Sequence, residues 1–245
     1  MIVNFKTPYK RPLKFTGKFS DFSPKVHKDI LKLADEELNW WHYQVIFHFG
    51  CNAGTYQECC YFLPNALDYL TKDFDDSYEI ISNILFFIAS HHDKLQEDNI
   101  FIKCEEAILE ILLVLLLEFD IVHFDINQCQ DMGWNTENEY FVKNTDNVNE
   151  IIENLVKHDC LLSVVNNFMA QQFNQDCIAI YSLWFLELFR YLKVEGFGAK
   201  KNREIYWNWF INKKIIMLHF NKAKAVNNIK NLEKYLTKIG NITPE

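Results

Sequence analysis

Apolar residues recur along most of this chain at spacings of three and four, which places them on one face of an α-helix. Residues 99–119 show the pattern most strongly. Their polar stripe is limited to Lys103, Glu106 and Glu110, and beyond Glu110 the segment is apolar on all sides, so we expect this helix to run through the centre of its domain. Further helices are expected near 146–157, 160–173, 176–193 and 202–239. The pattern predicts an all-α fold with roughly 8–10 helices, as a multi-helix bundle or as stacked helical hairpins of the HEAT-like kind.

Short polar motifs predict where several helices begin. Ser23-Pro24 combines a capping hydroxyl with proline in the first turn, and the helix or helix pair that follows is expected to end at Gly50. Thr55–Glu58 and Asp76–Glu79 have the spacing of capping boxes. Pro64 lies in the apolar run after the first box and is expected to kink or split that helix.

Residues 120–145 break the helical pattern. Asn, Asp and Gly are mixed there with Trp134, Tyr140 and Phe141, without a sustained period. We expect one long irregular loop, of the kind that often carries function, and the segment also leaves room for a short strand pair. The predicted organisation is an irregular basic N-terminal segment, residues 1–22, followed by a single all-α domain over residues 23–240.

Composition excludes several classes of protein. Apolar residues make up 49% and aromatic residues 16% of the chain, which argues against disorder. The seven cysteines form no CxxC pair, so reduced thiols are expected and neither a metal nor another cofactor is predicted. The start of the chain lacks the apolar core of a signal peptide, and the apolar run Ile111–Leu117 is far shorter than the ~20 residues that span a bilayer. A cytoplasmic protein without a membrane segment is expected.

Charge is distributed unevenly along the chain. Residues 31–199 hold 28 Asp and Glu against 8 Lys and Arg, whereas residues 200–238 hold 10 basic residues against 2 acidic ones. Such an acidic body attracts basic proteins and repels phosphate. Nucleic acid is therefore not the expected partner, although phosphate binding by residues 200–238 stays an alternative.

No catalytic residue is predicted. Residues 75–79 (DDSYE) match the DDxxE pattern that all-α terpene synthases use to hold magnesium, but a helix N-terminus explains the same acids. His91-His92-Asp93 suits the end of a helix, and Cys51 beside Gly50 would need a positioned histidine base. A small all-α enzyme is therefore a minor alternative.

Two stretches carry a resemblance to a known class of proteins. LNWWHYQVIFHFG at 38–50 and TYQECCYFLPNALDYL at 55–70, in an all-helical chain rich in Phe and Asn, resemble bacterial immunity proteins. These are encoded beside contact-dependent growth inhibition toxins and other polymorphic toxins. The resemblance covers mainly residues 30–120 and rests on overall character, so no binding residue is carried over position by position.

The resemblance implies a cytosolic, non-enzymatic protein that binds a cognate toxin and blocks the toxin's active site. The acidic body fits a basic partner, of which a nuclease toxin is the common example. A helical scaffold or adaptor for another basic protein is the alternative. The residues expected to bind the partner are acidic or aromatic and lie in two clusters: Asp125, Asp131, Trp134, Glu137, Glu139 and Tyr140 in the 120–145 segment, and Asp73, Asp75 and Asp76.

Overall fold

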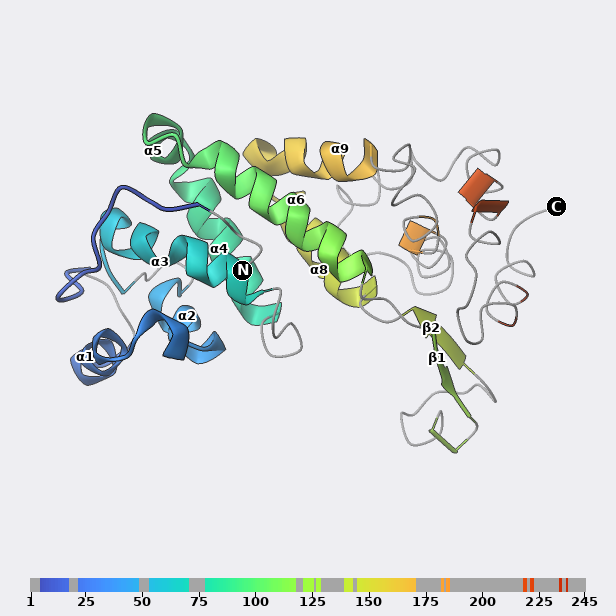
Figure 1. Cartoon of the computed structure of the whole chain (residues 1–245), viewed down its shortest axis with the longest axis horizontal. Coiled ribbons are helices and arrows are strands. Elements are labelled where there is room, and N and C mark those ends of the chain that lie inside the picture. The colour runs from blue at the N-terminus through green and yellow to red at the C-terminus, as the bar shows by residue number, and fades with distance from the viewer. Residues whose placement is uncertain are drawn as a thin grey trace. The chain divides into compact units, whose positions relative to one another are not determined.

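The computed structural model describes residues 5–17, 22–48, 53–70, 78–117, 121–125, 127–128, 139–142 and 145–170, with positions 182, 184, 185, 218, 219, 221, 222, 234 and 237 (Figure 1). The chain divides into two compact units. The first unit contains Met1–Val114 and Glu150–Phe168, and the second contains Leu115–Asn149 and Met169–Glu245.

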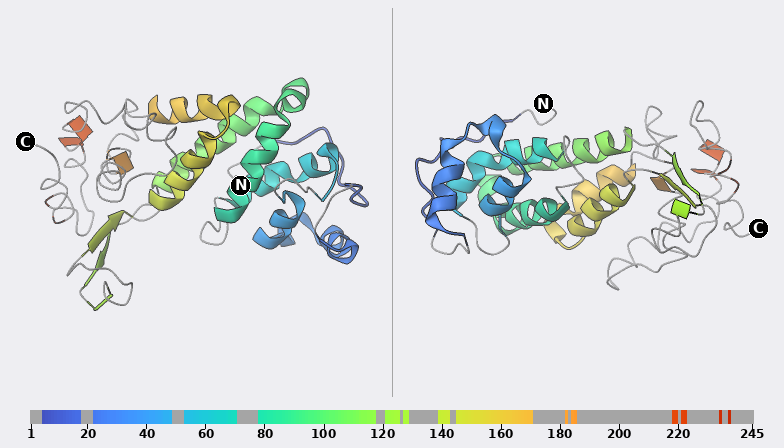
Figure 2. Two further views of the ribbon diagram at one scale, coloured as in Figure 1. Left: turned by 180° about the vertical axis from the view of Figure 1, so that it is seen from behind. Right: turned by 90° about the horizontal axis from the view of Figure 1, so that it is seen from below.

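The described part of the chain is built from helices (Figure 1, Figure 2). In chain order they are α1 (Pro24–Lys32), the 3₁₀ turn η1 (Asp35–Glu37), α2 (Trp40–Ile46), α3 (Tyr56–Tyr69), α4 (Tyr78–Ser90), α5 (His92–Glu97), α6 (Phe101–Leu117), α8 (Thr145–Leu155), the 3₁₀ turn η2 (Asp159–Leu161) and α9 (Leu162–Ala170). The predicted all-α multi-helix fold is confirmed, while its finer form, a bundle or stacked hairpins, stays a prediction. The boundary between the units falls within α6, α8 and α9, and the single domain over residues 23–240 also stays a prediction.

The helix starts follow the local motifs of the sequence. Ser23 is the N-cap of α1, and its Oγ accepts a hydrogen bond from the Val26 amide at 3.5 Å. The Thr55 amide donates to Glu58 Oε2 at 2.8 Å at the start of α3, as the capping box predicts. The start of α4 follows the predicted box at Asp76, which lies outside the described residues.

Helix α3 runs without a break through Pro64, so the predicted split does not occur. Pro64 is buried, as are its neighbours Phe62 and Leu63. Helix α3 also contacts both α2 and α4. This packing outweighs the backbone hydrogen bond that a proline inside a helix removes, since most helical stability in proteins comes from tertiary contacts.

Apolar side chains from successive helices form the core of the first unit. The Phe47 and Phe87 rings meet edge to face at 5.2 Å, which joins the end of α2 to α4. Cys59, Cys60 and Cys104 are buried free thiols, as expected for small apolar core residues. The second half of α6 is largely buried, as predicted: Ile111 and Leu112 lie in this core, and Leu115 and Leu116 are buried in the part of the helix that belongs to the second unit.

In the second unit, the segment from 120 to 145 contains the strand pair for which the sequence left room. Strand β1 (Ile121–Phe124) pairs antiparallel with β2 (Glu139–Val142), with Ile121 opposite Val142 and Phe124 opposite Glu139. The expectation of an irregular loop throughout this segment is therefore wrong for these eight positions. Alternation of apolar and polar residues over only four positions is too short to distinguish a strand from a loop by sequence.

Residues 5–17, named here the N-terminal segment, form no helix or strand, yet three carboxylates hold them in place. The Tyr9 hydroxyl donates to Asp98 Oδ2 at 2.5 Å, and Arg11 Nη1 lies 2.7 Å from Asp35 Oδ1. Thr16 donates to Glu58 through both its amide, at 2.9 Å, and its hydroxyl, at 2.7 Å. These three carboxylates therefore bind the N-terminal segment of the same chain and hold it against the helices.

Gly54 allows the N-terminal segment to approach the start of α3. A Cβ at position 54 would lie 2.9 Å from Phe15 Cδ1 and 2.7 Å from Glu58 Oε2. Both distances are shorter than carbon atoms in proteins tolerate, so the contact requires glycine.

A Schellman motif joins α5 to α6. Asn99 has a φ of 58°, in the left-handed region. Its amide donates to Gln96 O at 3.0 Å, and the Ile100 amide donates to Leu95 O at 2.8 Å. The two apolar residues of the motif, Leu95 and Ile100, are both buried. The motif satisfies the last carbonyls of α5 and turns the chain into α6.

Replacing Glu58 with Gln is expected to lower the free energy of unfolding by about 1–2 kcal/mol near neutral pH, because charged acceptors make the stronger hydrogen bonds. Burial raises the pKa of Glu58, but the hydrogen bonds from Thr16 and Thr55 outweigh it and hold the pKa below its ordinary 4.5. The stabilisation is therefore full above the unfolded pKa and is lost as pH falls through the lowered folded value. Urea unfolding of both proteins at a series of pH values measures this effect. If the difference in unfolding free energy between the two proteins stayed constant down to about pH 3, this role of the Glu58 carboxylate would be contradicted.

Replacing Asn99 with Ala is expected to destabilise the first unit by about 1 kcal/mol, because alanine lacks the short polar side chain that makes a left-handed φ less costly for asparagine. Asn99→Gly should leave stability within a few tenths of a kcal/mol or raise it, since glycine adopts this conformation freely. Thermal or urea unfolding compares the two variants. Equal stability of the Ala and Gly variants would show that the turn does not depend on this φ.

Candidate functional site

Most residues of the predicted binding site lie outside the described part of the chain. This applies to Asp73, Asp75, Asp76, Asp131, Trp134 and Glu137. The other three predicted residues are in or beside the strand pair of the second unit. Asp125 directly follows β1, while Glu139 and Tyr140 begin β2, opposite Phe124 and His123. The pairing thus brings both ends of the predicted loop cluster to one end of the two-stranded sheet.

Asp125 is exposed, but its carboxylate has a local role. Oδ1 accepts hydrogen bonds from the amides of Asn127, at 2.9 Å, and Gln128, at 3.0 Å. The Asp125 amide in turn donates to Gln128 Oε1 at 3.0 Å. These reciprocal hydrogen bonds cap a turn. They account for an aspartate at position 125 without any need for a partner protein.

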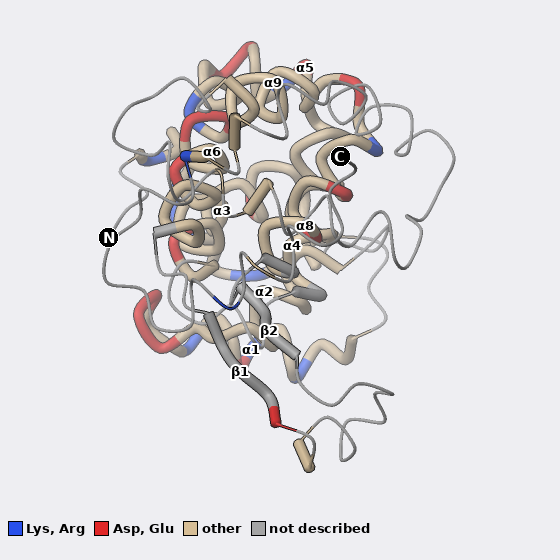
Figure 3. Tube along the Cα trace, turned by 90° about the vertical axis from the view of Figure 1, so that its right-hand side faces the viewer, with Lys and Arg blue, Asp and Glu red and all other residues tan. Residues whose placement is uncertain are grey.

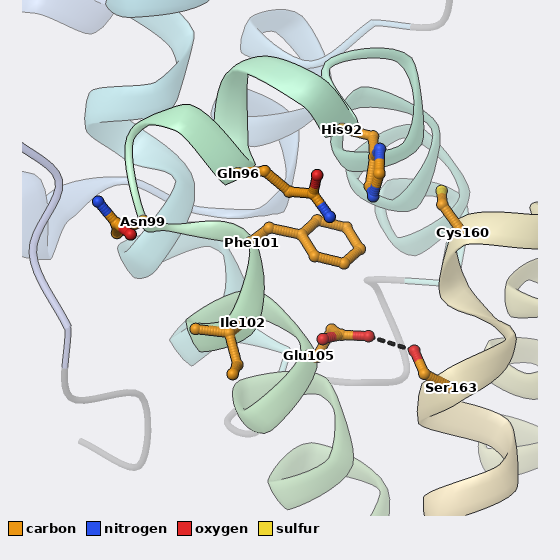
Figure 4. Close-up of a pocket in the computed structure, with 8 residues that line it drawn as sticks. All are labelled: His92, Gln96, Asn99, Phe101, Ile102, Glu105, Cys160 and Ser163. Atoms are coloured by element: carbon orange, nitrogen blue, oxygen red, sulfur yellow. Dashed lines mark hydrogen bonds between the residues drawn. The ribbon is translucent and has the colours of Figure 1, made fainter.

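The first unit contains a groove that the sequence did not reveal (Figure 4). It has a volume of about 430 Å³ and lies between the α5–α6 hairpin and the segment that leads from η2 into α9. We name it the α6–α9 groove. Its lining residues are His92, Gln96, Asn99, Phe101, Ile102, Glu105, Cys160 and Ser163.

Two contacts define the walls of the groove. The His92 and Phe101 rings meet edge to face at 4.5 Å, which packs α5 against the first turn of α6. Across the groove, the Ser163 hydroxyl of α9 donates to the Glu105 carboxylate of α6 (Figure 4). The Schellman turn at Asn99 leads into α6, where Glu105 points toward Ser163 and the Ile102 side chain points away from it (Figure 4).

Carboxylates from three elements act on one point of the groove. Burial raises the pKa of the Cys160 thiol, and the negative charges of Asp159, Glu105 and Asp93 raise it further. These acids belong to η2, α6 and α5 respectively. Negative charge from these three carboxylates therefore adds to the effect of burial at the Cys160 thiol.

An exposed stripe on α6 extends the acidic surface beyond the groove. Glu106 and Glu110 are exposed and follow Ile102 at intervals of four, so the three residues share one helix face. Ile102 is 60% exposed, which is unusual for isoleucine. Acidic positions, in red in Figure 3, recur along the helices of the first unit. The surface thus combines one large exposed apolar side chain with acidic neighbours.

The Cys160 thiol of the groove does not have the pKa of an activated nucleophile. A nucleophilic cysteine requires a lowered pKa, whereas the pKa of the Cys160 thiol is raised. The neighbouring His91 follows α4, where its Nδ1 lies 3.0 Å from Phe87 O, as predicted for a histidine at a helix end. Burial lowers the pKa of His91. Within the described ranges, no three His, Cys, Asp or Glu side chains are grouped as a metal site requires, and no helix is both long and apolar enough to cross a membrane.

Sequence reasoning missed the groove because its residues are far apart along the chain. Glu105 and Ser163 are separated by 58 positions, and neither belongs to a recognisable motif. One signal was present: Ile102 adjoins the polar stripe Lys103, Glu106 and Glu110 and interrupts the polar face of the predicted helix.

The resemblance to immunity proteins stays a prediction once the geometry of the groove is known. The strand-pair residues Asp125, Glu139 and Tyr140 likewise stay a predicted binding surface. The groove is interpreted from its own chemistry, because no protein family, curated protein or solved structure matches the chain.

Proposed function

We propose that this protein is a non-enzymatic binding protein whose α6–α9 groove and adjoining α6 stripe bind a basic segment of another protein. The observation that carries the proposal is the exposed face of α6, where Ile102, 60% exposed, precedes the exposed Glu106 and Glu110 by four and eight positions, beside a groove whose wall includes Glu105. Lys and Arg side chains of a partner would find complementary charge there, and Ile102 would supply an apolar anchor.

Charge complementarity explains the expected behaviour of such a surface. Exposed carboxylates such as Glu106 and Glu110 accelerate the encounter with a basic partner but contribute little to the lifetime of the complex. Buried anchors determine that lifetime instead. Ile102 is the exposed apolar residue nearest to these acids on α6, so it should govern dissociation.

Within this proposal, the partner is a cognate toxin that the protein neutralises by covering the toxin's active site. The resemblance of residues 38–50 and 55–70 to immunity proteins supports this choice, as does the net acidic charge of residues 31–199. A cytoplasmic location follows from the same proposal. The alternative, a scaffold or adaptor for a different basic protein, would use the same surface and differ only in the partner.

The test is binding to a basic toxin domain, sought first in the gene that precedes this one, and followed in real time by biolayer interferometry. The double variant Glu106→Gln/Glu110→Gln should reduce the association rate constant roughly 3- to 10-fold at low ionic strength, because it removes steering charge. Ile102→Ala should instead raise the dissociation rate constant about 5-fold, as loss of an anchor does. Both sites are exposed, so the fold should be retained.

The matched control is Asp29→Asn/Glu37→Gln, which removes the same amount of charge from α1 and η1. Gln at position 37 keeps an acceptor for the Ala34 amide, which donates to Glu37 Oε2 at 2.6 Å. If the association rate constant fell equally in the control and in Glu106→Gln/Glu110→Gln, the effect would come from net charge alone. That result would overturn the groove as the binding site. If only the double variant Asp125→Asn/Glu139→Gln lost binding, the binding site would be at the strand pair. Binding to a basic protein other than a toxin would favour the adaptor.

A further inference from the structure

A second recess of the first unit is lined by tyrosines. It has a volume of about 570 Å³, and four tyrosines contribute to its walls: Tyr9 of the N-terminal segment, Tyr43 of α2, and Tyr61 and Tyr69 of α3. The Tyr43 and Tyr69 rings are neighbours, with centroids 5.5 Å apart and planes inclined at 51°. We name this recess the tyrosine cavity. A tyrosine can present either the electronegative face of its ring or its hydroxyl oxygen to a cation, and both interactions are favourable.

Three carboxylates line the same cavity. Asp68 of α3 is only 3% exposed, Asp35 of η1 is half-buried, and Glu36 is exposed at the surface. Arg11 and the Tyr61 hydroxyl, at 2.7 and 2.6 Å, bind Asp35. Lys6 is the basic residue among the lining side chains, and it is exposed.

The buried wall of the cavity experiences net negative potential. Burial raises the pKa of Tyr43, and the charges of Asp35 and Asp68 raise it further, while Arg11 lowers it only in part. Burial and the hydrogen bond to Asp35 likewise raise the pKa of Tyr61 to about 12. Both phenols therefore stay protonated at neutral pH and keep hydroxyl groups that can hydrogen-bond to a ligand.

We propose that the tyrosine cavity binds a small organic cation, an ammonium ion of metabolite size. The aromatic faces and the carboxylates both favour positive charge, and the volume is in the range of small-molecule sites. An anion would meet the three carboxylates of Asp35, Glu36 and Asp68 against the two positive charges of Lys6 and Arg11. A neutral ligand of equal size would gain neither interaction.

The position of the N-terminal segment favours a free small molecule over a side chain of another protein. Phe5, Lys6, Thr7 and Tyr9 form one wall of the cavity, and η1, α2 and α3 form the others. The N-terminal segment thus lines the cavity together with the helices, and the enclosed volume suits a ligand of small-molecule size.

The experiment compares protonated benzylamine with benzyl alcohol, which has the same shape without the charge, by titration calorimetry of the full chain at pH 7. The ammonium ion should bind about 10-fold more tightly, as expected when a cation lies against aromatic faces and carboxylates. Equal affinities, or no binding of either compound, would overturn the proposal. No protein partner is present, so the result is independent of the α6–α9 groove.

Two exposed residues of the lining provide variants that should not disturb folding. Glu36→Gln should weaken benzylammonium binding roughly 3-fold, and Lys6→Met should strengthen it by a similar factor, because each removes one charge near the ligand. Glu106→Gln, on α6 and outside the lining, is the control and should have no effect. A Lys6→Met variant with unchanged or weaker binding would show that the cation does not bind in this cavity.

Discussion

The pairing of the N-terminal segment with Asp35, Glu58 and Asp98 is the interaction on which the arrangement of the first unit depends. Each carboxylate accepts hydrogen bonds from more than one donor: Asp98 from Tyr9 and Tyr56, Asp35 from Arg11 and Tyr61, and Glu58 from Thr16 and Thr55. A partly buried carboxylate without such donors would be strongly unfavourable. The segment and the helices therefore depend on each other.

Two of these contacts, at Asp98 and Asp35, also position the recesses. Asp98 is the C-cap of α5 and immediately precedes Asn99, so its bond to Tyr9 ties the N-terminal segment to the turn that starts α6 and the α6–α9 groove. At Asp35, the bonds from Arg11 and Tyr61 hold the segment across η1 and α3, where it forms a wall of the tyrosine cavity. One extended segment thus contributes to two sites without belonging to any helix.

Charge has different consequences at the two recesses because the carboxylates differ in exposure. On the α6 stripe beside the groove, exposed acids such as Glu106 and Glu110 act through solvent, where their influence extends about 8–10 Å at physiological ionic strength. At the cavity, Asp68 is almost fully buried and its charge acts on Tyr43 through a less polar medium. The former arrangement suits encounter with a large basic partner, and the latter suits a small cation.

Local features of the fold were predictable, and the failures have a physical explanation. The caps at Ser23 and Glu58 and the helix over 101–117 involve residues within a few positions of one another, so sequence spacing reveals them. Pro64 did not split α3, because burial against α2 and α4 is a tertiary effect. The pairing of Ile121–Phe124 with Glu139–Val142 joins segments whose short patterns had no strand signal of their own. The two recesses depend on contacts between residues that are still farther apart in the sequence.

The sequence by itself determined the helical class of the fold, the positions of several helix ends and the excess of acidic residues between 31 and 199. These properties follow from side-chain period, capping chemistry and composition. Only the tertiary structure decided which acids are used internally and which face a recess. Tyr9 meets Asp98 across 89 positions, and Ser163 meets Glu105 across 58. Contacts of such separation arise from the packing of whole helices, and no local spacing rule encodes them.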